Sequence, residues 1–142
     1  MKKYKIGLTT GVYDMFHIGH LNVIRNAKAM CEQLIVGVST DELVEQYKNK
    51  TPIVNYENRR DIVAAIRYVD LVVPQNDMNK LKLAQAVGAN AIFVGSDWQG
   101  TEKWNKIEAE LKSVGIDVVY LPHTDGVSST MLRGLYKGRV ND

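Results

Sequence analysis

The sequence lacks the features of disulfide-bonded, membrane-spanning and nucleic-acid-binding proteins. Its one cysteine, Cys31, excludes an intramolecular disulfide. No apolar run approaches the roughly 20 residues that a spanning helix needs, and the apolar stretch near the N-terminus is too short for a signal peptide. The formal net charge is only +2 and is spread along the chain, which argues against a basic strip for DNA or a membrane surface. We therefore expect a cytoplasmic protein with no nucleic-acid partner and no membrane insertion.

What remains is the composition of an ordinary globular domain. Of the 142 residues, 45% are hydrophobic and 24% are charged. This length is enough for one domain, residues 1–142, whose core needs neither disulfides nor a metal ion. Because the net charge is small, a phosphate ligand would have to be held by a local cluster of side chains.

Short strand-like runs alternate with stretches of helical periodicity along the chain. Strands are predicted at residues 5–9, 34–38, 71–73, 91–94 and 118–121, the third of them ended by Pro74. Helices are predicted at residues 20–31, 41–47, 57–68, 79–87, 102–114 and 128–136. The alternation predicts an α/β fold, a Rossmann-like open, mostly parallel five-stranded sheet with helices on both faces. Cys31 falls on the apolar side of the first helix, which favours a buried core thiol.

The predicted topology also says where a ligand would bind. In open parallel sheets, ligands bind beyond the carboxyl ends of the strands, near the point where the strand order switches. The residues of interest are therefore those that directly follow Thr9, Val38, Val73, Val94 and Leu121.

A segment with two of the chain's three histidines follows the first strand. Gly11 lets the backbone turn tightly and approach a ligand. His17 and His20 are three residues apart, so in a helical turn both imidazoles project to one side, and Gly19 leaves room for a base or ribose. The helix that begins here directs its unpaired N–H groups and the positive end of its dipole to the same space. These features indicate a triphosphate site with the histidines as donors to the attacked phosphate. The alternative is that the histidines have only a structural role. A zinc site is a weaker possibility, because no third ligand is evident nearby.

The spelling of this segment resembles a known family. The run from His17 to His20 matches the H-x-G-H motif of the nucleotidyltransferase superfamily, which class I aminoacyl-tRNA synthetases also carry, but 142 residues are too few for a synthetase. The lead-in from Gly11 is similar to the cytidylyltransferase branch, most of all to its members that act on glycerol 3-phosphate, and the similarity extends from about Lys5 to about Arg133. It implies nucleotide binding by Thr10, Gly11, Val12, Tyr13, Asp14, His17, Gly19 and His20.

An arginine lies on the apolar stripe of the helix predicted next. Arg59 aligns with Ile62, Val63 and Ile66, whereas Arg60 points away and is expected to be a solvated surface charge. An arginine on the core face must either snorkel or meet a buried anion. The resemblance implies that Arg59 is catalytic and holds the substrate.

Three lysines are candidates for phosphate contacts. Lys48 and Lys50 lie two apart in a predicted loop, so both could reach one ligand from an extended backbone. A solvated basic loop is the alternative from the residues alone. The resemblance implies that Lys48 is catalytic and binds the substrate phosphate, that Lys50 binds the triphosphate, and that Lys80 also contacts the substrate.

Two further segments match the family. Asp97 and Trp98 follow a strand and resemble its Gly-x-Asp-Trp segment; Asp97 would orient a substrate hydroxyl or bind a divalent ion, and Trp98 is either a substrate contact or a core-edge aromatic. A glycine turn and a serine-rich helix start at residues 124–130 suit the β- and γ-phosphates. The resemblance implies nucleotide binding by His123, Thr124, Gly126, Ser128, Ser129 and Thr130.

Residues 123 and 129 depart from the family pattern. His123 replaces an arginine and so gives up a permanent, fork-shaped charge, whereas Ser129 is a mild replacement for threonine. We hypothesise that Arg133, one turn into the last helix, partly restores that charge. A different acceptor is the other explanation.

The resemblance implies that CTP and sn-glycerol 3-phosphate react to CDP-glycerol and pyrophosphate, by in-line attack on the α-phosphate. The cofactor would be Mg²⁺, carried with the triphosphate rather than by protein ligands alone. A homodimer and a role in wall or capsule polymer synthesis are implied in the same way. Other alcohol phosphates, choline or ethanolamine phosphate, ATP in place of CTP, and an idle nucleotide-binding module are the alternatives. No aromatic cluster of the kind a choline cage needs stands out in the sequence, which favours a polyol acceptor.

Overall fold

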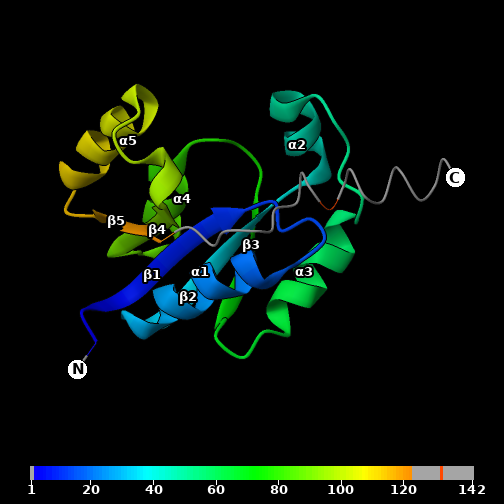
Figure 1. The fold of residues 1–142 in the computed structure, drawn as a ribbon. Coiled ribbons are helices and arrows are strands. Elements are labelled where there is room, and N and C mark those ends of the chain that lie inside the picture. Colours follow the sequence, from blue (N-terminus) through cyan, green and yellow to red (C-terminus); the bar gives the residue numbers. More distant parts are fainter. Residues whose placement is uncertain (1, 123–131, 133–142) are drawn as a thin grey trace, which may run out of the picture.

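One parallel sheet organises the chain (Figure 1). The computed structural model describes residues 2–122 and Leu132, and within them the strand order is β3-β2-β1-β4-β5. The strands are β1 (Tyr4–Gly11), β2 (Cys31–Ser39), β3 (Leu71–Gln75), β4 (Ala91–Gly95) and β5 (Asp117–Leu121). Every pairing between them is parallel, so their carboxyl ends meet at one edge of the sheet. The predicted five-stranded parallel fold is confirmed.

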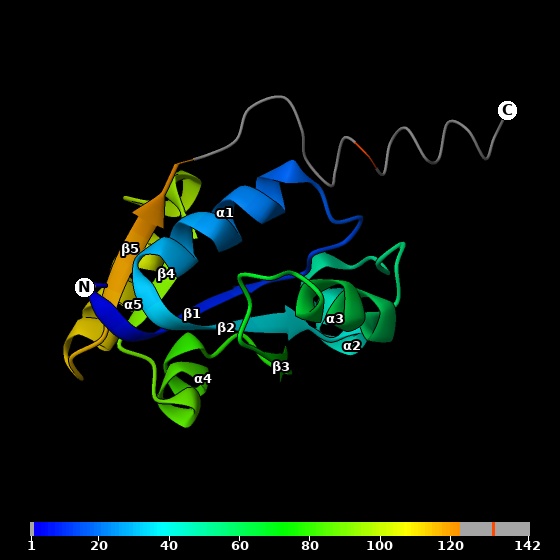
Figure 2. The same ribbon diagram turned by 90° about the horizontal axis from the view of Figure 1, so that it is seen from below.

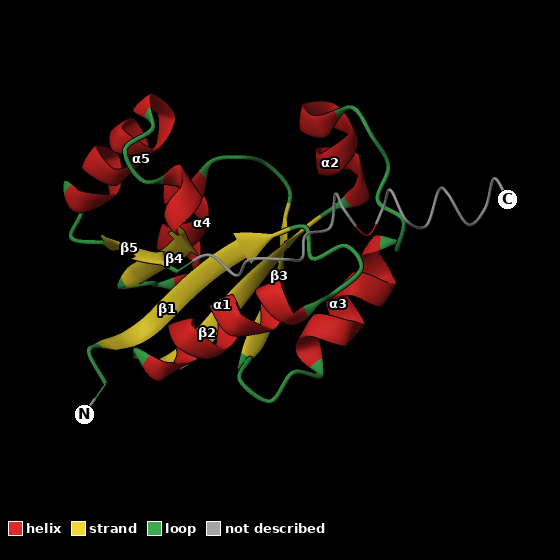
Figure 3. Cartoon of the chain, viewed as in Figure 1, coloured by secondary structure: helices red, strands yellow, loops and turns green. Residues whose placement is uncertain are grey.

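Helices cover both faces of the sheet (Figures 2 and 3). They are α1 (Ile18–Ala29), α2 (Asp41–Lys48), α3 (Tyr56–Ala64), α4 (Lys80–Val87) and α5 (Glu102–Lys112), with a short 3₁₀ turn, η1 (Ser96–Trp98), after β4. α1 and α3 pack on one face, and α4 and α5 on the other. None of these helices has the length and apolarity that crossing a membrane requires.

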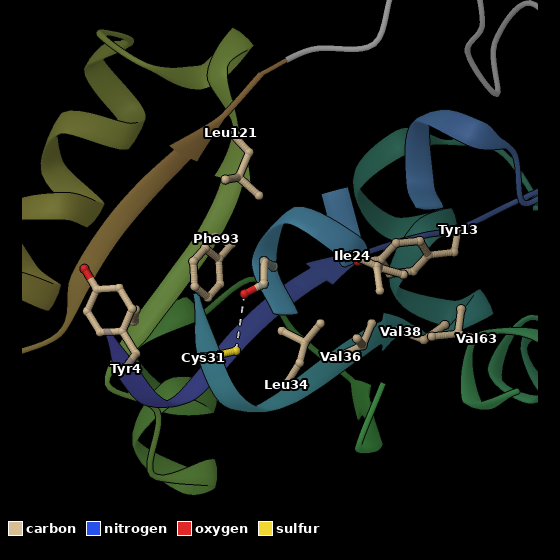
Figure 4. Packing of buried hydrophobic residues seen from close by; sticks show 12 residues of the cluster. Tyr4, Tyr13, Ile24, Cys31, Leu34, Val36, Val38, Val63, Phe93 and Leu121 are labelled. Atoms are coloured by element: carbon tan, nitrogen blue, oxygen red, sulfur yellow. Dashed lines mark hydrogen bonds between the residues drawn. The ribbon is translucent and has the colours of Figure 1, made fainter. Parts of the chain in front are cut away.

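Alternation along β2 divides the core between the two faces. Leu34, Val36 and Val38 pack with α1 and α3, whereas Ile35 packs with α4 and α5. This is the period of two that a strand imposes. Because both faces are covered, the strand reads as a nearly continuous apolar run. Figure 4 shows the α1 and α3 side of this core, where the ring of Phe93 stands between the strands and the helices.

Cys31 is buried, as expected, but it does not lie in a helix. α1 ends at Ala29, and Cys31 is the first residue of β2, paired with Tyr4 of β1. Its Sγ donates to the carbonyl oxygen of Ala27 at 3.4 Å (Figure 4). The prediction that the helix runs to residue 31 was wrong because an apolar residue at the end of a helical pattern fits the start of a buried strand equally well.

The predicted inward stripe of α3 is only partly correct. Val63 is buried, and Arg59 lies on the same face one turn earlier. Ile62, however, is 43% exposed. α3 ends at Ala64, but Ile66 beyond it is partly buried and packs against the same core, as predicted. The prediction of an inward Ile62 was wrong because the buried face is centred on the pair four residues apart, which leaves residue 62 at its margin.

Pro74 does not end β3, contrary to prediction. The strand continues through Pro74 to Gln75, which pairs with Ser39. β3 is the outer strand of the sheet and pairs with β2 alone, and an edge strand tolerates a residue without a backbone donor. The extra residues carry Gln75 to the carboxyl edge of the sheet.

Candidate active site

His17 and His20 form a reciprocal cap at the start of α1. The Nδ1 atom of His17 accepts the backbone N–H of Gly19 at 3.1 Å, and the Nδ1 atom of His20 accepts the backbone N–H of His17 at 3.2 Å. This is the geometry of a capping box, with imidazoles in place of the usual hydroxyl and carboxylate. The two rings stack with their centroids 3.9 Å apart. The structural and the functional interpretation of these histidines are therefore compatible.

The cap determines which ring nitrogens carry protons. A nitrogen that accepts a hydrogen bond has no proton, so each neutral imidazole must carry its proton on Nε2. Burial lowers the pKa of His17, and burial together with the neighbouring His17 lowers the pKa of His20 to about 4. At neutral pH the pair therefore presents two uncharged Nε2–H donors.

The loop between β1 and α1 is held in an unusual conformation. Tyr13 and Met15 have positive φ angles of 56° and 50°, which cost conformational energy for residues with a Cβ. The buried Tyr13 ring packs edge-on against His20 at 5.3 Å and fixes that imidazole from behind. A Cβ on Gly11 would lie 3.1 Å from two Tyr13 ring atoms. Glycine at position 11 thus makes room for Tyr13, a reason the sequence did not suggest.

Asp14 fixes the loop that precedes α3. Its two carboxylate oxygens accept the backbone N–H groups of Ile53 and Val54 at 2.8 and 2.9 Å. The side chain is buried. Its contacts join the loop between β1 and α1, residues 12–17, which we call the histidine loop, to residues 53 and 54. Its predicted role in nucleotide binding stays a prediction.

Arg59, on α3, joins the carboxyl ends of β1 and β2. Its guanidinium donates to the carbonyl oxygens of Val12 and Ser39, each at 2.7 Å, to that of Val54 at 2.8 Å, and to the carboxylate of Asp41 at 2.6 Å. The Arg59 side chain has 0% exposure and therefore does not snorkel; the anion that it meets is Asp41, whose side chain is 29% exposed. Arg60 is partly exposed and pairs with its neighbour Asp61, as a surface charge would. Substrate contact by Arg59 stays a prediction.

A cavity of about 400 Å³ opens at the carboxyl edge of the sheet. It brings together six residues that the sequence singled out: Thr10, Gly11, Val12, Lys48, Lys80 and Trp98. They come from β1, α2, α4 and η1, which are far apart in sequence. The position is the one expected for a ligand of an open parallel sheet.

Lys80 reaches the cavity from the start of α4. Its Nζ donates to the Thr10 hydroxyl at 2.8 Å. Burial, together with the nearby ammonium of Lys103, lowers the pKa of Lys80 to about 8. An anion placed between these two ammonium groups would relieve both effects.

The other two predicted lysines do not share an extended loop. Lys48 is the last residue of α2 and lines the cavity, whereas Asn49 turns the chain with a left-handed φ of 54°. Lys50, beyond that turn, is exposed and is not part of the cavity wall. The expectation of an extended backbone between Lys48 and Lys50 was therefore wrong, because α2 runs one residue further than the apolar pattern indicated.

Trp98 and Asp97 also separate. Trp98 forms part of the cavity wall, whereas Asp97 is exposed in η1 and lies outside that wall. The remaining predicted site residues, His123, Thr124, Gly126, Ser128, Ser129 and Thr130, fall outside the described residues, as do Arg133 and the last predicted helix.

The cavity also contains polar residues that sequence reasoning missed. Ser39 and Gln75 end β2 and β3, and Lys103 lies in the first turn of α5. Ser39 directly follows Val38, where the strand-end rule points, but it was not singled out. The rule would have reached Gln75 if the third predicted strand had been extended through Pro74. Nothing in the sequence pattern sets Lys103 apart from the other lysines of its amphipathic helix.

The described residues contain no group of three or more histidine, cysteine, aspartate or glutamate side chains that could hold a metal ion. The cavity walls instead carry lysines, which suit anions. The expectation that Mg²⁺ is carried with the triphosphate stays a prediction.

Replacing Arg59 by methionine is expected to lower the free energy of unfolding by about 3 kcal/mol or more, because three buried or partly buried carbonyls and Asp41 lose their donor. The matched control is Arg60→Met, on the same helix but partly exposed, for which a change within about 0.5 kcal/mol is expected. Urea denaturation measures both. Equal losses of unfolding free energy in the two variants would contradict the view that Arg59 acts as a clamp, that is, that its four hydrogen bonds hold these segments together.

His20 should make stability depend on pH. Its pKa is lowered from 6.5 to about 4 in the folded chain, so its stabilising contribution is complete above pH 6.5 and is lost as pH falls toward 4. The loss should approach ~3 kcal/mol. His20→Gln keeps a side-chain acceptor at the capping position without titrating, so urea denaturation from pH 7 to 4 should show a flatter profile for this variant. Superimposable profiles would contradict the assignment.

Comparison with known proteins agrees with this geometry. The family model described as Cytidylyltransferase-like matches residues 8–135. The glycerol-3-phosphate cytidylyltransferases of Staphylococcus aureus and Bacillus subtilis are 35% and 36% identical to this chain over 127 residues, covering 89% of it and 90% and 92% of those proteins. The lipopolysaccharide core biosynthesis protein of Thermoplasma volcanium has the same fold, with a TM-score of 0.71 at 22% identity over 87% of this chain and 99% of that one. The chain therefore belongs to the cytidylyltransferase-like family.

Proposed function

We propose that this enzyme joins CTP to sn-glycerol 3-phosphate, giving CDP-glycerol and pyrophosphate. The observation that carries the proposal is the pair of neutral Nε2–H donors of His17 and His20 at the start of α1. The residues that precede them in the chain, 10–12, line a cavity that also contains lysines. The relatives that share about a third of its residues are named for this reaction.

In this reaction an oxygen of the acceptor phosphate attacks the α-phosphorus of CTP. The new P–O bond forms as the bond from the α-phosphorus to the bridging oxygen breaks, and pyrophosphate leaves with that electron pair. The α-phosphate oxygens gain charge in the transition state, where His17 and His20 donate to them from a preorganised position. Since both rings are neutral, each supplies one fixed hydrogen bond from Nε2 and no positive charge.

The acceptor would lie in the cavity beside the histidine loop. Lys48 and Lys80 would hold its phosphate, with Lys103 adding a third positive charge. Two ammonium groups close enough to lower a pKa are a costly arrangement unless an anion separates them. The serine- and threonine-rich segment at residues 124–130 is proposed to hold the leaving pyrophosphate.

Mg²⁺ fits this site only as a companion of the triphosphate. The described residues offer no carboxylate or histidine cluster for it, and Mg²⁺ commonly binds through substrate phosphates and water. When bound, it would neutralise phosphate charge.

A choline phosphate acceptor is the second candidate, because the cavity contains aromatic residues that the sequence did not group. Tyr47, Trp98 and Trp104 all line it. Aromatic faces can bind a quaternary ammonium. Lys48, Lys80 and Lys103 line the same cavity and would repel that cation. The positive charge of the cavity therefore favours an acceptor whose alcohol part is an uncharged polyol over one that carries a quaternary ammonium.

A matrix of CTP, ATP, GTP and UTP against glycerol 3-phosphate, choline phosphate and ethanolamine phosphate, followed by pyrophosphate release, tests the proposal. CTP with glycerol 3-phosphate should give a kcat/KM at least about tenfold above any other pair. His17→Asn retains a good helix cap and removes the imidazole donor, so kcat should fall by about 100-fold or more with little change in stability. Near-normal turnover by this variant would refute the assigned chemistry.

A further inference from the structure

Gln75 is a buried amide in the wall of the active cavity that the reaction as described does not use. It is the last residue of β3, pairs in register with Ser39 of β2, and is only 3% exposed. Both residues line the cavity together with Lys48 and Lys80. Figure 1 shows β3 at the edge of the sheet, with α4 following it.

One hydrogen bond holds the side-chain amide of Gln75 and another holds its backbone. The Ser39 hydroxyl donates to Oε1 of Gln75 at 3.1 Å, and the Thr40 backbone N–H donates to the Gln75 carbonyl oxygen at 3.1 Å. The Ser39 carbonyl oxygen is in turn held by Arg59 at 2.7 Å. One end of the side chain is therefore anchored to the same clamp that holds the histidine loop.

The other end of the amide has no partner. Nε2 of Gln75 is the one buried side-chain nitrogen or oxygen among residues 2–122 and Leu132 that makes no hydrogen bond. Such atoms are rare in folded proteins, because a donor taken out of water without a new acceptor destabilises the native state. A donor left in this condition at the wall of a substrate cavity has the chemistry of a binding group.

We propose that Gln75 is a specificity-determining residue whose Nε2 donates to a hydroxyl oxygen of the phosphorylated acceptor. The inference rests on the proposed function. The nucleotide belongs at the switch between β1 and β4, next to the histidine loop, and Gln75 lies on the other side of β1, beyond β2. A neutral amide suits an uncharged hydroxyl, whereas the lysines of the cavity suit the phosphate.

This assignment predicts the class of acceptor. A site with a buried donor discriminates strongly against an analogue that lacks the matching oxygen, because the donor then stays unpaired. The enzyme should therefore prefer polyol phosphates to analogues from which the hydroxyl has been removed.

The test compares three acceptors in the wild-type enzyme and in Gln75→Met, which has a similar length and no donor. The acceptors are sn-glycerol 3-phosphate, 3-hydroxypropyl phosphate and 2-hydroxypropyl phosphate, the last two each lacking one hydroxyl. Gln75→Met should lower kcat/KM for glycerol 3-phosphate at least about tenfold, leave the KM for CTP unchanged, and leave kcat/KM for one of the two deoxy analogues unchanged. Asn76→Met is the matched control, since Asn76 is exposed and lies outside the wall of the active cavity; it should behave as wild type.

The outcomes separate the two proposals. Equal losses with all three acceptors, a raised KM for CTP, or no loss at all would overturn the role of Gln75 while the reaction itself stands. A wild-type enzyme that releases no pyrophosphate with any acceptor would overturn the proposed function and this inference with it. If Gln75→Met fails to fold, Gln75→Glu keeps an acceptor for Ser39 and has no amide donor, and it should show the same selective loss.

Discussion

The buried guanidinium of Arg59 is the contact on which the geometry of the site depends. It binds carbonyl oxygens at the ends of β1 and β2 and in the loop before α3, and it pairs with a carboxylate at the start of α2. Parallel strands end in loops whose carbonyl groups have no partners in the sheet. A guanidinium has five donors in a fixed plane and can hold four such groups in different directions, whereas a lysine has three donors on one atom. Arg59 thereby joins the start of the loop between β1 and α1, the start of α2, and Ser39, whose hydroxyl bonds Gln75.

Two kinds of donor are kept apart in the site. His17 and His20 are partly buried, stacked and used as a helix cap, and for these reasons they stay uncharged. The lysines of the cavity supply the positive charge. Neutral donors of fixed orientation suit a transition state in which charge is being redistributed, whereas the lysines suit a phosphate whose charge is permanent. In the proposed reaction, the cap would serve catalysis by fixing the tautomer.

Much of this arrangement could be predicted from the sequence. Short apolar runs and stretches of helical periodicity located the five strands and the helices between them, and the helical period through Arg59 and Val63 set that arginine apart from Arg60. The strand-end rule located Thr10 and Gly11. Errors arose at element boundaries, where a residue such as Cys31 fits a helix end and a strand start equally well.

The residues that were missed depend on contacts across the fold. Gln75 lies beyond Pro74, and only the position of β3 at the edge of the sheet explains why the strand continues that far. Lys103 belongs to the site because α5 packs beside α4, which no local pattern expresses. The histidine cap depends on ring orientations that spacing alone does not give.

The protonation state of the histidine pair is the central claim, and nitrogen NMR of the labelled imidazole rings measures it directly. At pH 7 both His17 and His20 should be neutral with the proton on Nε2, and His20 should titrate with a midpoint near 4. A charged ring at pH 7, or a proton on the Nδ1 atom of either residue, would contradict the account.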